Sequence, residues 1–170
     1  LREMLQTIIM NLFGTLNITI EGREVDLSGE WGSVSFRDLI LKYADIDINI
    51  ANTKEKLLDA INDKNIVIES EVALEDLGFG NLVDQLYKKV ARPHLVNPVF
   101  LVEHPTDLSP LARANDDNPN IVDRFQLVIN GAEIINAYSE LVDPQEQEKR
   151  LLEQAKLKEA GDEEAMPMDY

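Results

Sequence analysis

The sequence predicts an α+β fold with an antiparallel sheet. Apolar residues recur at the three- and four-residue spacing of amphipathic helices in several segments, most clearly over residues 81–90. Two β-rich runs meet at Asn130-Gly131, the dipeptide most typical of a two-residue hairpin turn. The 170 residues, 44% of them hydrophobic, suffice for one domain with a single core. Helices and a hairpin in one domain indicate the α+β class.

The first part of the chain is expected to be mostly helical after an initial hairpin. Ser35 and Thr53 are suited to N-cap positions, Gly14 weakens the end of the first helix, and Pro93 should end the last one. The helices expected from apolar spacing cover residues 1–16, 36–43, 53–62 and the stretch from 81 to just before 93. A short hairpin is expected around residues 21–24, a loop over 26–32, and 66–79 is ambiguous.

The second part of the chain contains the predicted strands. Residues 99–102 are suited to a short strand, and the proline-rich stretch 104–120 to a loop. Strands follow on both sides of Asn130-Gly131. The last helix, 144–160, has Asp143 as its expected cap and Gly161 just past its end.

The hairpin predicts a polar face only if one strand contains a bulge. A two-residue turn pairs Val128 with Glu133, and strict alternation would then bury an amide and a carboxylate among apolar residues. One extra residue between Glu133 and Asn136 avoids this cost. We therefore expect a bulge, with Ile134 on the apolar face. The polar face would hold Gln126, Glu133, Asn136, Tyr138 and Glu140.

This polar face admits two interpretations. Carboxylates on rigid strands could bind a divalent metal or a cationic ligand, with an aromatic wall beside an ammonium-bearing chain. The alternative is a solvated sheet face stabilised by cross-strand pairs. The two histidines, His94 and His104, lack metal-site spacing and are interpreted as ordinary loop residues. Trp31 is expected to be a packing anchor.

Composition excludes several function classes. The net charge of −16 opposes non-specific attraction to nucleic-acid phosphates, and no apolar run approaches the length of a membrane span. The absence of cysteine excludes disulfides and thiol chemistry, so the cytoplasm is the expected compartment. Because residue 1 is Leu, we expect the chain to be part of a longer one.

Several motifs together resemble class II lysyl-tRNA synthetases. They are Pro93-His-Leu-Val-Asn-Pro-Val-Phe, Ser109-Pro-Leu-Ala-Arg, Asp123-Arg-Phe-Gln, Asn130-Gly-Ala-Glu-Ile, Asn136-Ala-Tyr-Ser-Glu-Leu, Asp143-Pro-Gln-Glu-Gln and Glu159-Ala-Gly-Asp-Glu-Glu-Ala-Met. The likeness is dense from Gly80 to Tyr170. It implies a partial catalytic domain over 1–170, in the antiparallel sheet between the second and third class-defining motifs, with 35–93 as a mostly helical insertion.

The resemblance also implies a role for each polar residue of the hairpin. Carboxylates on the two arms bind Mg²⁺ and the ATP phosphates in this family; they fall on Gln126, which is a neutral amide here, and on Glu133. Asn136 matches the contact to the lysine carboxylate, Tyr138 lies along the aliphatic chain, and Glu140 accepts the ε-ammonium.

The implied activity is the ATP- and Mg²⁺-dependent attachment of lysine to tRNA(Lys). The arginine motifs that bind ATP are absent from these residues, so the isolated fragment is expected to be inactive. Such enzymes are homodimers, but the dimer motif precedes this segment. One alternative is a non-catalytic paralogue or regulatory module that binds lysine, and another is a purely structural interaction domain.

Overall fold

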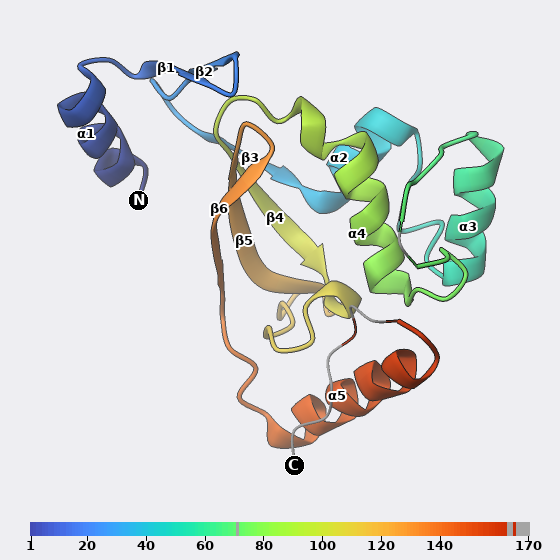
Figure 1. Cartoon of the computed structure of the whole chain (residues 1–170). Coiled ribbons are helices and arrows are strands. Elements are labelled where there is room, and N and C mark those ends of the chain that lie inside the picture. Colours follow the sequence, from blue (N-terminus) through green and yellow to red (C-terminus); the bar gives the residue numbers. More distant parts are fainter. Residues whose placement is uncertain (71, 163–164, 166–170) are drawn as a thin grey trace.

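A four-stranded sheet forms the centre of the protein in the computed structural model, which describes residues 1–70, 72–162 and 165 (Figure 1). The strands, in spatial order, are β3 (Gly32–Ser35), β4 (Val99–Pro105), β5 (Ile121–Ile129) and β6 (Ala132–Tyr138). The β4–β5 and β5–β6 pairs are antiparallel, and β3 joins β4 in parallel. The predicted α+β fold with a mostly antiparallel sheet is confirmed.

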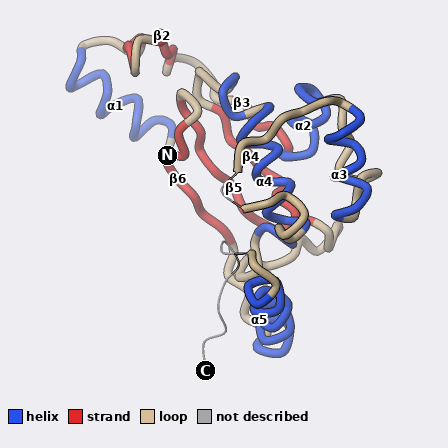
Figure 2. Tube along the Cα trace, turned by 45° about the vertical axis from the view of Figure 1, so that its right-hand side comes forward, coloured by secondary structure: helices blue, strands red, loops and turns tan. Residues whose placement is uncertain are grey.

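Three helices lie on one side of this sheet: α2 (Phe36–Ala44), α3 (Lys54–Asp63), which packs on α4, and α4 (Phe79–Val90). Figure 2 shows them together on one side of the strands. The caps predicted from sequence form, because the Ser35 and Thr53 side chains accept hydrogen bonds from the first-turn amides. Leu101 and Val128 of the sheet share the larger core cluster with these helices. That residues 35–93 are an insertion stays a prediction.

The other face of the sheet contacts the N-terminal elements. Helix α1 (Arg2–Phe13) ends at Gly14, whose φ of 70° is left-handed, and the hairpin of β1 (Asn17–Ile20) and β2 (Arg23–Asp26) follows. Leu127 and Ile129 of β5 form a second core cluster with buried residues that precede β3. Trp31 is among them at 8% exposure and donates from its indole nitrogen to Leu27, so its predicted packing role is confirmed.

Helix α5 (Pro144–Glu159) lies at the lower edge of the molecule in Figure 1. Asp143 caps it as predicted, accepting from the amides of Gln145 and Glu146. Arg150 connects the helix to the rest of the fold, since the residue is 8% exposed and its guanidinium donates to the carbonyl oxygen of Ala112 at 2.9 Å. Part of the C-terminal motif, at 163, 164 and 166, falls outside the described residues.

Several element boundaries differ from those expected from sequence, and the helix expected over 1–16 ends at Phe13. The loop expected over 26–32 gives way to β3 at Gly32, α4 begins at Phe79, and β4 continues through Pro105, in the stretch expected to be a loop. A short parallel strand has no local signature, because its pairing partner lies far along the chain. Within the described ranges, every helix is too short or too polar to cross a bilayer.

Candidate functional site

The hairpin of β5 and β6 contains the predicted bulge. Asn130 and Gly131 form the turn with φ values of 49° and 71°. Val128 pairs with Glu133, but the next pair joins Leu127 to Ile135, so Ile134 is the extra residue of β6. The bulge expected between Glu133 and Asn136 is confirmed.

One detail of this bulge was predicted wrongly. Ile134 was expected on the apolar face, but it is the unpaired residue and is 49% exposed. Ile135 takes the position opposite Leu127 and packs against the second core cluster. The sequence alone does not distinguish these two neighbours, because either isoleucine could be the extra residue.

The bulge places the polar residues on one face of the hairpin. On the side of the bulge away from the turn, Gln126 pairs with Asn136 and Arg124 pairs with Tyr138. Directly paired residues share a face. Val128, on the same face, belongs to the core cluster under α4. The polar face therefore lies on the side of the sheet that α2 and α4 cover.

The last residue of the predicted set lies just beyond β6. Glu140 forms an isolated bridge with Ala112, and its side chain is exposed. The following Leu141 is buried at 8% exposure, so the chain alternates here as a strand does. By this alternation, Glu140 follows Tyr138 on the same side of the chain, at the end of the hairpin away from the turn.

A small cavity opens beside Asn136 and Tyr138. Its volume is about 140 Å³, and residues 108–112 form its other wall. Arg124 lines it, donating from Nε to Oδ1 of Asn136 at 3.0 Å and from Nη1 to the Ser109 hydroxyl at 2.7 Å. Burial lowers the pKa of Arg124 below its ordinary value, yet a guanidinium remains charged in proteins. A guanidinium fixed by these hydrogen bonds beside the Asn136 amide is suited to binding a carboxylate.

Gln126 and Glu133 lie further up the hairpin and are bonded to each other. The Gln126 amide nitrogen donates to the Glu133 carboxylate, while its oxygen lies 3.2 Å from Nε2 of His104. Both functional atoms of Gln126 are therefore engaged, and a metal ion would find oxygen ligands on Glu133 alone. Over the described residues, no group of three or more His, Asp or Glu could hold a metal. This arrangement does not fit a metal bridge between positions 126 and 133.

Sequence reasoning missed three residues of this site. Arg124 was given no role, and Ser109 and His104 were placed in loops. His104 is fully buried, and burial lowers its pKa from 6.5 to about 4. Its proximity to Gln126 had no local signal, because it results from pairing between β4 and β5. The Ser109-Pro motif could have indicated Ser109.

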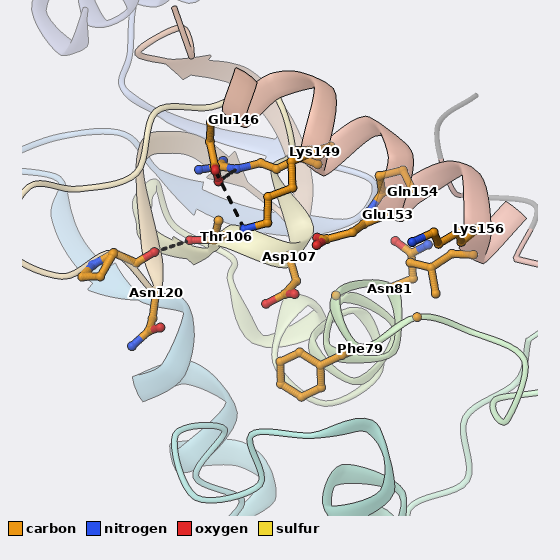
Figure 3. A pocket seen from close by; sticks show the side chains of 16 residues that line it. Phe79, Asn81, Thr106, Asp107, Asn120, Glu146, Lys149, Glu153, Gln154 and Lys156 are labelled. Atoms are coloured by element: carbon orange, nitrogen blue, oxygen red, sulfur yellow. Dashed lines mark hydrogen bonds and ion pairs between the residues drawn. The ribbon is translucent and has the colours of Figure 1, made fainter. Parts of the chain in front are cut away.

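A larger cavity lies elsewhere, between α4, the chain around Thr106 and α5 (Figure 3). Its volume is about 550 Å³, but none of the five predicted site residues lines it. Its wall carries charges of both signs, among them Glu146 with the ammonium of Lys149 at 3.9 Å. Opposite charges that pair with each other favour no ligand of one sign, so the hairpin remains the candidate site.

Comparison with known proteins agrees with the hairpin's motifs. The family model of tRNA synthetases class II (D, K and N) matches residues 1–169. The chain is 41% identical over 167 residues to the lysine–tRNA ligase of Thermosipho africanus, and 39% identical over 167 and 170 residues to those of Thermotoga maritima and Pasteurella multocida. Each alignment covers 98% of this chain but 32–33% of the relative, so the chain spans about a third of their length.

Proposed function

Because this chain belongs to the class II tRNA synthetases (D, K and N), we propose that it provides the lysine- and ATP-binding hairpin of a lysyl-tRNA synthetase. That enzyme activates lysine with ATP and transfers it to tRNA(Lys). The relatives named above are all lysine–tRNA ligases, which favours lysine over aspartate and asparagine as the substrate. The proposal includes a cytoplasmic homodimer in which 1–170 is part of the catalytic domain and 35–93 an insertion.

The amino-acid end of the site lies along β6. Arg124 orients the Asn136 amide, and together they can hold the lysine carboxylate at the cavity. Tyr138, 44% exposed, offers an aromatic surface to the aliphatic chain. Glu140, two residues further, accepts the ε-ammonium; along a strand, four residues span roughly 13 Å, which leaves room for an extended lysine between the two ends.

The nucleotide end of the site is centred on Glu133. Its carboxylate lies on the same face as Asn136, toward the turn. Mg²⁺ bound to ATP would neutralise the phosphates, and Glu133 is the residue of this pair that can approach it. Gln126 would contact the nucleotide as a neutral amide. Glu133 also lies near α4, where burial raises the pKa of Tyr87 to about 12 and both Arg92 and Glu133 are charged neighbours.

The observation that carries this proposal is the bulge at Ile134. It puts Gln126, Glu133 and Asn136 on one face, with Tyr138 next in line, whereas a regular ladder would separate Glu133 from Tyr138. The runner-up function, a lysine-binding module without catalysis, is favoured by the neutral Gln126. Lysine-dependent exchange of pyrophosphate into ATP, assayed on the full-length protein, separates the two: the synthetase catalyses it, and the module only binds lysine.

The test of lysine recognition is isothermal titration of the full-length protein and its Glu140→Gln variant. Loss of a charge-assisted hydrogen bond of about 1.5–3 kcal/mol should weaken lysine binding roughly 10- to 100-fold. Glu148→Gln, an exposed carboxylate on α5, is the matched control and should bind lysine like the wild type. Equal lysine affinity in all three proteins would remove the assigned role of Glu140.

A further inference from the structure

A buried histidine contacts the nucleotide end of the site. His104 is fully buried, and its ring packs against Phe36 with centroids 5.4 Å apart. Its Nε2 lies 3.2 Å from Oε1 of Gln126, while its Nδ1 is buried without a hydrogen-bond partner among the described residues. The side-chain hydrogen bond of this ring is therefore made to Gln126.

An irregularity in β4 turns His104 toward the site. Val102 pairs with Phe125, but His104 pairs with Val122, so two residues of β5 lie opposite Glu103. Glu103 has a φ of 56°, a left-handed conformation that is unfavourable for a residue with a side chain. In a regular strand His104 would face away from Leu101; after this turn its ring packs against Phe36, which shares a core cluster with Leu101. Such strained bulges characteristically re-aim a side chain beside a functional site.

The direction of both hydrogen bonds follows from the groups involved. An ionised carboxylate only accepts, so the Gln126 nitrogen must face Glu133 and its oxygen must face His104. His104 then has to donate, which places its hydrogen on Nε2. Rotating the Gln126 amide by half a turn would oppose its oxygen to the Glu133 carboxylate, an unfavourable contact of two acceptors.

We propose that His104 is a positioning residue that fixes the Gln126 amide, so that Gln126 donates to Glu133 and the pair does not hold a divalent cation in the free protein. The inference rests on the proposed function only for the role of Glu133 in nucleotide binding. Its consequence is that a metal ion reaches this site with the ATP phosphates, through Glu133, and not through a preformed protein site.

The first test is NMR of the isotope-labelled 170-residue chain. Hydrogen–nitrogen correlation spectra of the histidine rings should place the hydrogen of His104 on Nε2 at neutral pH. A hydrogen on Nδ1 would overturn the proposal, because Nε2 could not then donate to Gln126. His94, stacked on Tyr43 at 4.4 Å, is the internal comparison.

The second test uses Mn²⁺ as the probe, read from paramagnetic broadening of the Glu133 backbone amide signal. The wild type should show no selective broadening, whereas Gln126→Glu adds a carboxylate and should bind Mn²⁺ at least about tenfold more tightly. Equal broadening in both proteins would refute the proposal.

Two His104 variants separate positioning from packing. His104→Phe keeps a ring against Phe36 but has no donor, so Gln126 is released, its side-chain amide signals shift, and Mn²⁺ broadening appears at Glu133. His104→Gln places an amide nitrogen near the former Nε2 position and should restore the wild-type behaviour. Identical Gln126 signals in wild type and His104→Phe would contradict the positioning role.

These measurements use no lysine, ATP or tRNA. A failed lysine titration alongside the expected NMR results would overturn the proposed function and leave the His104 assignment standing. A lysine titration with the expected result, alongside NMR results that contradict the proposal, would overturn the His104 assignment and leave the proposed function standing.

Discussion

Deletion of Ile134 should leave the polar face intact, contrary to the usual expectation for a deletion inside a strand. The pairs on either side of this residue are Val128 with Glu133 and Leu127 with Ile135. Removing the extra residue joins these pairs into a regular antiparallel ladder without changing any partner. The positions below the bulge, from Asn136 onward, keep their faces.

The energetic effect of this deletion should be small. Full burial of an isoleucine side chain contributes about 1.5–3 kcal/mol, and Ile134 is 49% exposed, so roughly 1 kcal/mol of burial is lost. The deletion also removes the cost of ordering one residue, about 1–2 kcal/mol, which opposes that loss. We expect the unfolding free energy to change by no more than about 1 kcal/mol and the lysine affinity to stay within about threefold of the wild type.

Deletion of Ala137 is the matched comparison. Ala137 pairs with Phe125, so its removal moves Tyr138 opposite Phe125 and turns Tyr138 and Glu140 to the other face. Lysine binding should weaken by about 10-fold or more, since the charge-assisted bond of about 1.5–3 kcal/mol is lost. Urea unfolding, isothermal titration with lysine and NMR contacts between Gln126 and Asn136 measure these effects. Loss of binding in the Ile134 deletion, with its stability retained, would refute the reasoning.

Two further predictions concern stability away from the site. Gly80→Ala should lower the unfolding free energy by about 1–3 kcal/mol, because the added Cβ would lie 2.5 Å from the Asp107 carbonyl oxygen. Gly32→Ala is the control, because its added Cβ meets open space. Equal urea midpoints for the two variants would contradict this prediction. The hydrogen bonds from Arg37 lower the pKa of Asp47 from 3.8 to about 2, so the stability contributed by Asp47 is present above about pH 4 and is lost as the pH falls through 2. Acid titration followed by circular dichroism should show that Asp47→Asn loses less stability than the wild type as the pH falls. The same dependence of stability on pH in both proteins would argue against this role.

The parts of the fold that sequence predicted correctly depend on local chemistry. The caps at Ser35, Thr53 and Asp143 form because a side-chain oxygen meets amides two or three residues away. The turn at Asn130-Gly131 forms because both residues tolerate positive φ. Each of these signals lies within a few consecutive residues, so a single sequence is sufficient to detect it.

The features that sequence did not predict depend on distant pairing. Strand β3 exists because Gly32 and its neighbours pair with β4, more than sixty residues later. His104 was placed in a loop because Pro105 suggested that the strand had ended, yet both residues pair with β5. The identity of the bulged residue, Ile134, follows from which isoleucine packs opposite Leu127.

The two ends of the candidate site therefore differ in how closely their residues match those that the family resemblance implies. At the proposed lysine end, the residue types expected from the resemblance are present, and the bulge in β6 gives Asn136 and Tyr138 a common face. At the proposed nucleotide end, the residue type changes at Gln126, and the irregularity between β4 and β5 adds a buried histidine beside it. An amide held by such a neighbour is a fixed donor and a poor metal ligand, so the substitution reverses what this position can offer, from an acceptor of cations to a donor toward Glu133. Lysine recognition and metal binding should for this reason respond independently to mutation, even though both sites lie on one hairpin.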